Sequence, residues 1–468
     1  DTEVLYTAFL EWGENCLNKL NGMFAFAIWD KEHKSLFAGR DRFGVKPFYY
    51  YQDDDNFIFA SEIKAIQKLI ETRLNQEVLA NYLMYGSYGL PNQTFYADIH
   101  QLPGGHQLTL KDKNLKINSW YDFVSRIKNK QKELSEITGD EAKKQYKTLV
   151  EESIALRFRA DVPVGFTLSG GVDSSLLLAL VNQRRDAEKI KAYTFYTNDE
   201  RYDELPWVEQ MVKSTQTELK KVCFKPDDFK YWHKLISQHQ DEPYGGLPTL
   251  AYAKLFQQIS DDGVKVILDG QGMDEAWAGY DYYQTTSTQT IQGQSQSSPF
   301  KANVLTEDLK NKAKKPEYPK PFGDELLDKQ YRDLFYTKIP RALRFNDRIS
   351  MAATTELREP FLDYKLVEFA FSLPTHFKIR DGQGKFLLRE ILSDYSKNVA
   401  FAPKRPLQTP QREWLGNELK NDVEHALEQI ENSELKIFFN IDKLKEEWKF
   451  YQNGQQNSSF HIWQWISV

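Results

Sequence analysis

The sequence has little of what marks secreted, membrane-inserted or nucleic-acid-binding proteins. Cys16 and Cys223 are the two cysteines among 468 residues, and without a CxxC spacing they predict neither a disulfide framework nor a zinc site. No segment approaches ~18 consecutive apolar residues, and the first residues lack a signal-peptide pattern. The 61 basic side chains are outnumbered by 67 acidic ones, so the net charge is -6, and no basic stripe is present. We therefore expect a cytoplasmic protein with neither a membrane nor a nucleic-acid partner.

What is present is the composition of a globular protein. Apolar residues make up 41% of the chain, aromatic residues 14% and charged residues 27%, which is too aromatic for a chain disordered throughout. The length suits about three average domains or two larger ones, each able to bury a core without disulfides. A homodimer is one assembly compatible with this composition.

The first 110 residues are predicted to be rich in β-strands. Short aromatic runs separated by charged turns are typical of antiparallel strands, and they occupy residues 24–29, 36–38, 48–51 and 57–60. The last two runs predict a hairpin. A charged stretch at 124–137 is interpreted as a linker, so we expect a partial antiparallel domain over 1–123 and a second domain over 138–468.

The second domain is predicted to be α/β. Thr138 and Glu141 have the spacing of a helix capping box, and apolar residues follow at helical spacing. Strands then alternate with helices, which predicts a parallel sheet with its ligand at the carboxyl ends of the strands. The expected strands are 164–168, 192–196 and 264–268. Three helices are expected: one that begins at residue 174, one at 205–213 and one at 248–259. Residues 284–299, rich in Ser, Thr and Gln, are expected to form a mobile surface loop, and the chain beyond about 325 is expected to be helical.

The strongest chemical signal is a turn of small residues between a predicted strand and an apolar helix. Its sequence is Ser169, Gly170, Gly171, Val172, Asp173, Ser174, Ser175. Small residues let the backbone approach a polyphosphate, and amide groups at a helix N-terminus favour negative charge. The lysine of a GxxxxGK[ST] P-loop is missing, which disfavours transfer of a γ-phosphate. A purely structural turn is the alternative, but the strand–turn–helix context favours a polyphosphate site.

This segment resembles the pyrophosphatase-loop enzymes, which cleave ATP between its α and β phosphates. Further motifs are similar to the glutamine-hydrolysing asparagine synthetase family, and they lie at 21–30, 40–47, 161–165, 347–352, 356–363 and 378–382. The resemblance implies an antiparallel glutaminase domain of the class II, Ntn type, followed by a parallel-sheet synthetase domain with a helical C-terminal part. It also implies that ammonia released from glutamine passes internally to an acyl-adenylate made from ATP and a carboxylic acid. In the parent activity that acid is aspartate, and the products include AMP and pyrophosphate.

The resemblance also implies the residues of an ATP and Mg²⁺ site. Asp173 and Asp274 would supply carboxylate oxygens to Mg²⁺, which usually keeps several waters and bridges phosphates, although a metal-free charged loop is the alternative. Lys385 matches a lysine over the reacting centre, where an ammonium would stabilise developing charge. Thr197 is the matching residue in one of two alignments to the family, which differ by one residue over positions 193–198. The expected nucleotide contacts are Leu168, Ser169, Gly170, Gly171, Asp173, Ser174, Ser175, Thr197, Asp269 and Gly270.

The acceptor side departs from the family pattern. Gln271 stands where asparagine synthetases commonly carry an acidic residue with a catalytic role, and an amide cannot act as a general base. Either another carboxylate, Glu275 or Glu356, takes the proton from ammonia, or the acceptor is a different acid such as a sugar uronic acid. Glu356 and Arg358 are expected near the acceptor pocket, with a structural ion pair as the alternative. Residues 403–407 also differ from the family pattern.

The first residues differ from the family as well. Family glutaminases use an N-terminal cysteine whose free α-amine acts as the base, whereas Cys16 lies inside the chain and is not expected to be a nucleophile. Asp1 matches an aspartate that binds the α-amine of glutamine. We therefore expect the first half of the glutaminase domain to be missing, the glutaminase half to be inactive, and free ammonia to be the nitrogen source. An inactive fragment with uncovered strand edges is the competing hypothesis.

Overall fold

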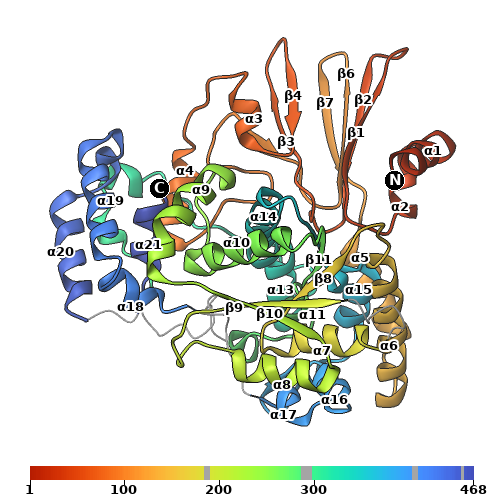
Figure 1. The fold of residues 1–468 in the computed structure, drawn as a ribbon. Coiled ribbons are helices and arrows are strands. Elements are labelled where there is room, and N and C mark those ends of the chain that lie inside the picture. The colour runs from red at the N-terminus through yellow and green to blue at the C-terminus, as the bar shows by residue number, and fades with distance from the viewer. Residues whose placement is uncertain (184–189, 286–297, 403–408, 455–457) are drawn as a thin grey trace.

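The computed structural model describes residues 1–183, 190–285, 298–402, 409–454 and 458–468. Antiparallel strands project from one end of the molecule, and a parallel sheet with its helices forms most of the remainder (Figure 1). The predicted loop at 284–299 lies mostly outside the described residues, and the divergent segment 403–407 lies wholly outside them.

The N-terminal part contains two antiparallel sheets. One has the order β1-β2-β6-β7 and the other β4-β3-β5. The predicted strands are confirmed, and the predicted hairpin is present because Tyr49 pairs with Ala60 in antiparallel register. The strands are β1 (Ala25–Asp30), β2 (Ser35–Arg40), β3 (Tyr49–Gln52), β4 (Phe57–Ala60), β5 (His100–Gln101), β6 (His106–Lys111) and β7 (Asn114–Ser119). The helices of this part are α1 (Thr2–Trp12), α2 (Cys16–Lys19), α3 (Ile63–Gln67) and α4 (Gln76–Tyr85).

The charged turn after β2 is buried because the backbone satisfies its charges. The Arg40 guanidinium donates to the carbonyl oxygens of Leu102 at 2.5 Å and Gly44 at 2.8 Å. The Asp41 carboxylate accepts from the backbone amides of Val45 at 2.9 Å and Lys46 at 3.0 Å. A buried charge whose hydrogen-bonding capacity is met in this way avoids most of the cost of leaving water.

The segment interpreted as a linker is mostly helical. Helix α5 (Phe123–Glu133) buries Phe123 and Ile127, which lie four residues apart and therefore on one face. Lys130 on this helix donates to Glu368 at 2.6 Å, so the segment packs against the second half of the chain. The predicted capping box at Thr138 is confirmed at the start of α6 (Gly139–Arg157). The domain boundary itself stays a prediction.

The second half is built on a five-stranded parallel sheet, as predicted. Its order is β10-β9-β8-β11-β12. The strands are β8 (Val164–Thr167), β9 (Lys191–Tyr196), β10 (Glu218–Cys223), β11 (Val266–Leu268) and β12 (Glu356–Arg358). The helices that follow these strands are α7 (Val172–Val181), α8 (Leu205–Thr215), α9 (Phe229–Gln240) and α10 (Gly246–Asp261). Because all strands are parallel, the loops after β8, β11 and β12 meet at one edge of the sheet.

The chain after β11 is largely helical, and the helical part expected beyond about residue 325 is present. Leu366, Phe369 and Ala370 of α15 are buried. Short strands β13 (Ile379–Arg380) and β14 (Gln383–Gly384) form one hairpin. The helices are α11 (Met273–Ala276), α12 (Glu307–Lys310), α13 (Glu325–Arg332), α14 (Lys338–Ala352), α15 (Tyr364–Ser372), α16 (Phe386–Ser393), α17 (Lys397–Ala400), α18 (Gln411–Gly416), α19 (Lys420–Asn432), α20 (Ile441–Gln452) and α21 (Phe460–Ser467).

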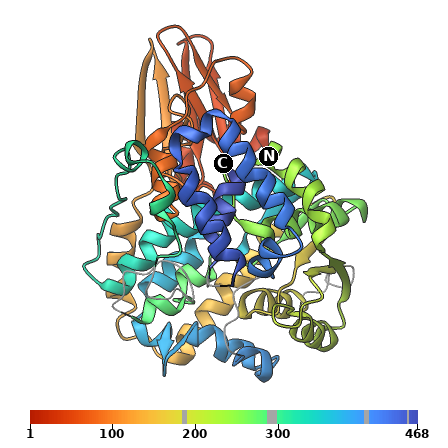
Figure 2. The same cartoon turned by 90° about the vertical axis from the view of Figure 1, so that its left-hand side faces the viewer.

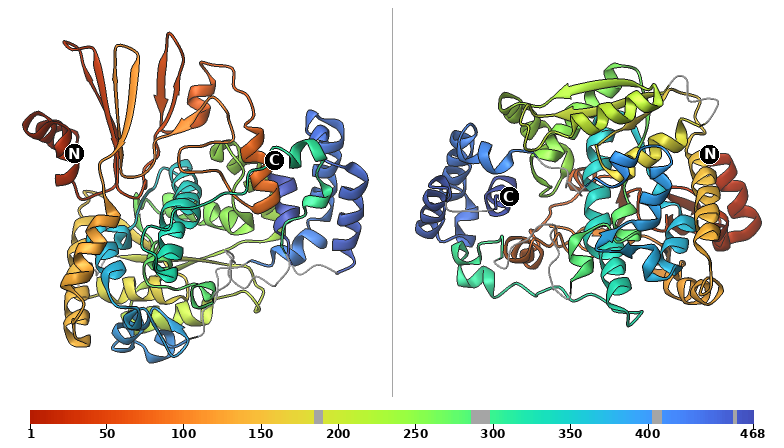
Figure 3. Two further views of the ribbon diagram at one scale, coloured as in Figure 1. Left: turned by 180° about the vertical axis from the view of Figure 1, so that it is seen from behind. Right: turned by 90° about the horizontal axis from the view of Figure 1, so that it is seen from below.

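The two halves of the chain are joined by buried and partly buried polar contacts. The C-terminal helices group on one side of the molecule, in blue in Figures 2 and 3, and the hydroxyl groups of Tyr82 on α4 and Ser467 on α21 lie 2.9 Å apart. Tyr121 donates to Glu368 at 2.9 Å, and Asn21 donates to Asp363 at 2.9 Å. Across the described ranges, no helix is both long and apolar enough to cross a membrane.

Candidate active site

The small-residue turn lies between β8 and the N-terminus of α7. The Ser174 hydroxyl donates to the carbonyl oxygen of Ser169 at 2.7 Å and accepts from the Ser169 amide at 3.1 Å. These bonds fold the turn back over the first turn of the helix. A Cβ atom on Gly170 would lie 2.8 Å from the Cβ of Trp207, so the close approach of α8 requires glycine there. The turn therefore presents backbone rather than side chains at a helix N-terminus, where anions bind favourably.

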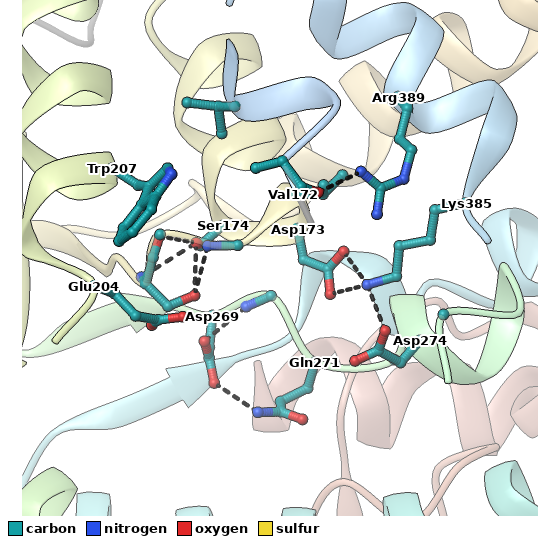
Figure 4. A pocket seen from close by; sticks show the side chains of 18 of the residues that line it. Val172, Asp173, Ser174, Glu204, Trp207, Asp269, Gln271, Asp274, Lys385 and Arg389 are labelled. Carbon is teal, nitrogen blue, oxygen red and sulfur yellow. Dashed lines mark hydrogen bonds and ion pairs between the residues drawn. The ribbon is translucent and has the colours of Figure 1, made fainter. Parts of the chain in front are cut away.

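A cavity of about 290 Å³, called the first cavity here, opens over this turn (Figure 4). Its walls come from the loops after β8 and β11, the starts of α8 and α16, and single residues of other helices. Ten of the predicted site residues line it: Ser169, Gly170, Gly171, Asp173, Ser174, Asp269, Gly270, Gln271, Asp274 and Lys385. Segments that are far apart in the sequence thus converge at the carboxyl edge of the sheet, as the topology predicts.

Lys385 lies between two carboxylates in this cavity. Its Nζ is 2.6 Å from both carboxylate oxygens of Asp173 and 2.5 Å from Oδ1 of Asp274 (Figure 4). Burial alone would lower the pKa of Lys385, yet the two carboxylates outweigh it and raise the pKa above its ordinary value. Lys385 itself has a φ of 60°, and its amide donates to the carbonyl oxygen of Trp277 at 2.9 Å. The loop after β11 thereby holds the lysine backbone in place.

Asp173 and Asp274 could supply part of the ligand set of a Mg²⁺ ion, with phosphate oxygens and water supplying the rest. Both carboxylates meet at one cation, which here is the ammonium of Lys385. Groups of three or more His, Cys, Asp or Glu side chains able to hold a metal ion do not occur in the part of the chain that the structure describes. Two carboxylates suit Mg²⁺, because this ion commonly takes its remaining ligands from water and substrate phosphates.

Gln271 lies beside a buried carboxylate on the opposite wall. Asp269 accepts hydrogen bonds from the Thr167 hydroxyl and the Gly270 amide, each at 2.7 Å, and from the Gln271 side-chain amide at 3.4 Å. Burial raises the pKa of Asp269 despite these bonds. Since Gln271 donates to Asp269, its side chain stabilises a carboxylate and cannot itself take up a proton.

Glu275 is a further buried carboxyl group on the wall of the first cavity. The Tyr280 hydroxyl donates to its Oε1 at 2.7 Å. Burial, followed by the nearby charge of Asp274, raises the pKa of Glu275 to about 7. Of the two carboxylates considered as alternatives to Gln271, Glu275 is the one that the structure places on this cavity.

Several predicted site residues do not line the first cavity. The Leu168 amide donates to Tyr193 of the neighbouring strand at 2.8 Å, and the Thr197 amide donates to Asp203 at 2.8 Å. Ser175 is fully buried within α7. Asp1 is exposed at the start of α1. Nucleotide or glutamine binding by these four residues stays a prediction.

Glu356 and Arg358 form the ion pair that was the alternative interpretation. The Arg358 Nε is 2.9 Å from Glu356 Oε1, and its NH1 donates to the carbonyl oxygens of Arg157 at 2.7 Å and Arg159 at 2.9 Å. Glu356 opens β12, so it lies at the edge of the sheet opposite the first cavity. The acceptor-side role proposed for these two residues therefore finds no support in this geometry.

Other residues on the first cavity were not predicted from the sequence: Glu204, Trp207, Tyr252, Tyr280 and Arg389. Arg389 follows Lys385 by four residues, and that spacing on a helix could have indicated a shared face. Its guanidinium donates to the carbonyl oxygens of Gly384 at 2.9 Å and Ala400 at 2.6 Å. Trp207 and Glu204 reach the cavity from the start of α8, where Pro206 marks the first turn.

Comparison with known proteins identifies the family of the chain. The Asparagine synthase family model matches residues 145–468, and the Glutamine amidotransferase domain model matches residues 1–121. The asparagine synthetase [glutamine-hydrolyzing] 3 of Bacillus subtilis (strain 168) is 30% identical over 440 residues, which cover 87% of this chain and 70% of that protein. The asparagine synthetase [glutamine-hydrolyzing] 1 of the same organism is 25% identical over 515 residues, covering 99% of this chain and 79% of that protein.

Among solved structures, the glutamine-dependent NAD⁺ synthetase of Acinetobacter baumannii is 12% identical. The match covers 59% of this chain and 66% of that one, and the TM-score of 0.24 is too low to support an argument. The family models and the two Bacillus subtilis relatives are sufficient to assign the family without this structural match. The chain belongs to the glutamine-hydrolysing asparagine synthetase family.

Proposed function

We propose that this chain activates a carboxylic acid with ATP as an acyl-adenylate and converts that intermediate with ammonia into an amide. Membership of the family supports ATP-dependent formation of a C–N bond. The observation that carries the proposal is the position of Lys385. Its ammonium is held by Asp173 and Asp274 in the cavity that opens over the small-residue turn at the N-terminus of α7.

The first cavity suits the polyphosphate of ATP. The backbone of Gly170 and Gly171 and the hydroxyl group of Ser169 offer donors at the N-terminus of α7, while Ser174 holds the turn in place. Asp173 and Asp274 would hold Mg²⁺, which when bound neutralises charge on the phosphates. Lys385 would then exchange its carboxylate contacts for phosphate oxygens.

The proposed reaction has two steps. In the first, a carboxylate oxygen of the acceptor attacks the α-phosphorus of ATP, the bond to the β-phosphate oxygen breaks, and pyrophosphate leaves. In the second, the nitrogen lone pair of ammonia attacks the acyl carbon, AMP leaves, and one proton must be removed from nitrogen. Lys385 can offset the negative charge that develops in both steps, because a fixed cation in a buried site costs no reorganisation.

Glu275 is the carboxylate positioned to take that proton. It lines the first cavity, whereas Glu356 is paired with Arg358 at the other edge of the sheet. A general base must lie within reach of the proton that it removes, and geometry is therefore the first criterion. The hydrogen bond from Tyr280 fixes one oxygen of Glu275 on the wall of this cavity.

The acceptor is a separate question, and Gln271 bears on it. Its side-chain amide lines the first cavity and donates to Asp269, so it does not supply the acidic group common in asparagine synthetases. This departure favours a carboxylic acid other than aspartate, such as a sugar uronic acid, as the second candidate substrate. If the purified protein made asparagine from aspartate at a rate that no uronate matched, this alternative would be wrong.

Pyrophosphate release tests the proposal directly. The full chain is incubated with ATP, Mg²⁺, ammonium and a panel of carboxylic acids that includes aspartate and glucuronate. We expect release that depends on one acid, and loss of that release in Asp173→Asn. Asp140→Asn, at an exposed position of α6, is the matched control and should keep the rate. Absence of ATP consumption with every acid would contradict the proposed function.

A further inference from the structure

A second cavity lies between the segment after α4 and the first turns of α14. Its volume is about 520 Å³, and small-molecule sites commonly span ~300–1,000 Å³. Tyr88, Tyr318 and Tyr336 contribute aromatic walls, and α14 contributes Lys338, Arg341 and Arg344. Both halves of the chain therefore build this second cavity, and it shares no lining residue with the first cavity.

The cations of α14 line the second cavity as a row. Lys338, Arg341 and Arg344 are spaced by three residues, which places successive side chains on neighbouring positions of one helix face. Arg344 has its charge compensated, because it pairs with Glu242 and also donates to the carbonyl oxygen of Pro243. Its guanidinium additionally lies 5.3 Å from the centre of the Tyr88 ring. Arg344 therefore serves as a fixed part of the wall.

Lys338 and Arg341 differ from Arg344 because no carboxylate is bonded to either of them in the described part of the chain. Within the described ranges, neither side chain forms an ion pair or a hydrogen bond. Lys338 is only 8% exposed, and burial followed by the charge of Arg341 lowers its pKa to about 7, although Asp333 and Glu275 act in the opposite direction. A buried amine and a half-buried guanidinium thus face the same cavity with no carboxylate bonded to either, so an oxyanion bound there would gain two charge-assisted contacts.

Arg341 also lies near the tyrosine hydroxyl groups of the second cavity. Burial raises the pKa of Tyr88 and of Tyr318, and the positive charge of Arg341 opposes this shift for both phenols. The guanidinium therefore sits within electrostatic reach of Tyr88, Tyr318 and Lys338, which come from three separate segments. Such convergence of polar groups inside a cavity with aromatic walls is the usual form of a ligand site.

We propose that the second cavity binds an organic anion whose carboxylate or phosphate group contacts Arg341 and Lys338 and whose ring packs against the tyrosines. The planar guanidinium matches the geometry of both oxyanions, and tyrosine rings offer flat apolar faces with a polar edge. Glu242 is engaged with Arg344 and does not compete for Arg341. This site is independent of the function proposed for the first cavity.

One tyrosine separates the two cavities. The Lys338 ammonium lies 5.0 Å from the centre of the Tyr280 ring, while Tyr280 lines the first cavity and donates to Glu275. An anion bound at Lys338 would therefore be one side chain away from the first cavity without entering it. Binding experiments must accordingly be made with the first cavity filled by a non-hydrolysable ATP analogue.

Isothermal titration of the full chain tests the proposal. The probes are glucuronate, glucose 6-phosphate and 4-hydroxybenzoate, with glucose as the neutral ring and inorganic phosphate as the free anion. We expect at least one charged ring compound to bind and glucose not to bind. Failure of all three charged ring compounds to bind would overturn the proposal. Inorganic phosphate binding as tightly as glucose 6-phosphate would overturn the role assigned to the tyrosines.

Variants then locate the binding. Arg341→Gln and Lys338→Met should each weaken binding at least tenfold, whereas Arg159→Gln, at an exposed position, should leave it unchanged. Thermal melting without probe provides the folding control. Because no carboxylate in the described part of the chain is bonded to Arg341, its removal should leave the melting temperature unchanged or raise it. Equal binding by Arg341→Gln, Lys338→Met and the parent chain would place the anion elsewhere and contradict the proposal.

Discussion

The Lys385 ammonium lies 2.6 Å from both oxygens of the Asp173 carboxylate, although the two residues are 212 positions apart in the chain. The contact connects the N-terminal turn of α7 with the N-terminal end of α16. Asp274 completes the arrangement at 2.5 Å from the same nitrogen. Two carboxylates and one ammonium thus contact one another at the place where we propose that Mg²⁺ and the phosphates of ATP bind.

Replacement of Lys385 tests its proposed role on the reacting phosphate. Lys385→Met should lower ATP-dependent pyrophosphate release by about 10²–10³-fold, because a fixed charge at the reacting centre is lost. The measurement is the rate of pyrophosphate release with the best acceptor acid. Lys397→Met, at an exposed position on α17, is the control and should keep the parent rate. An unchanged rate in Lys385→Met would show that another group stabilises the transition state.

Gly279 offers a test of the geometry that leaves every charged group in place. A Cβ atom at this position would overlap the Asp274 carboxylate and Cε of Lys385. Gly279→Ala should therefore displace both groups and reduce pyrophosphate release with little loss of secondary structure. The matched control is Gly139→Ala in the first turn of α6, where a Cβ meets nothing within 4 Å. Retention of full activity by Gly279→Ala would mean that Asp274 and Lys385 need not be held in this arrangement.

The sequence predicted the three central strands of the parallel sheet but not its two edge strands, β10 and β12. The turn at Ser169 follows an apolar strand and precedes an apolar helix, so local pattern was sufficient to identify it. Strand β10 was missed because its Lys220 and Lys221 obscure the apolar pattern, and an edge strand can tolerate exposed charge. Strand β12 was missed because it has only three residues and forms by pairing with the distant β11.

The same limits apply to the site. Asp274 and Lys385 were assigned from the family resemblance, and the structure brings both to the turn. Glu356 and Arg358 lie in a motif of the family, yet their side chains alternate with Leu357 and pair with each other. Charge alone suggested a linker at 124–137, whereas two apolar residues four positions apart proved enough to anchor α5. A motif therefore predicts which residues lie near the site, whereas the direction of each side chain depends on the register in which its strand pairs with the next.

The contact of Arg157 with Asp363 is expected to stabilise the junction between the two halves of the chain. Arg157 NH1 lies 2.5 Å from Asp363 Oδ2, which also accepts from Asn21 at 2.9 Å, and both charged residues are buried. Arg157→Met would leave a buried carboxylate without its cation, and the expected loss of unfolding free energy is about 3–5 kcal/mol. Denaturant unfolding measures this loss.

An exposed ion pair provides the comparison for Arg157. Lys147 and Asp394 lie 3.2 Å apart at the surface, with their side chains 36% and 62% exposed. Lys147→Met should cost below ~1 kcal/mol, since solvent and salt screen such pairs. Equal losses for Lys147→Met and Arg157→Met would show that burial does not decide the strength of the contact at Asp363.

His461 should make the fold sensitive to acid. Its ring is fully buried on α21, with ring centres of Tyr451 at 5.8 Å and Trp465 at 5.2 Å. Burial, aided by the charge of Lys301, lowers the pKa of His461 to about 3, even though Glu447 lies 3.9 Å from Nε2. The unfolded chain binds a proton near pH 6.5 while the native chain does not, so stability is present above that pH and falls as the pH drops toward 3.

This acid sensitivity can be isolated with one substitution. Lowering the pH from 8 to 5 should reduce the unfolding free energy by about 2 kcal/mol. The reason is that the histidine of the unfolded chain takes up a proton over this interval, whereas the native ring stays uncharged. His461→Phe keeps the ring and removes the titration, so the melting temperature of the variant relative to the parent should rise on going from pH 8 to pH 5. His425→Phe, at an exposed position on α19, should show no such pH-dependent gain. A constant difference between His461→Phe and the parent chain at both pH values would mean that the native protein also binds the proton.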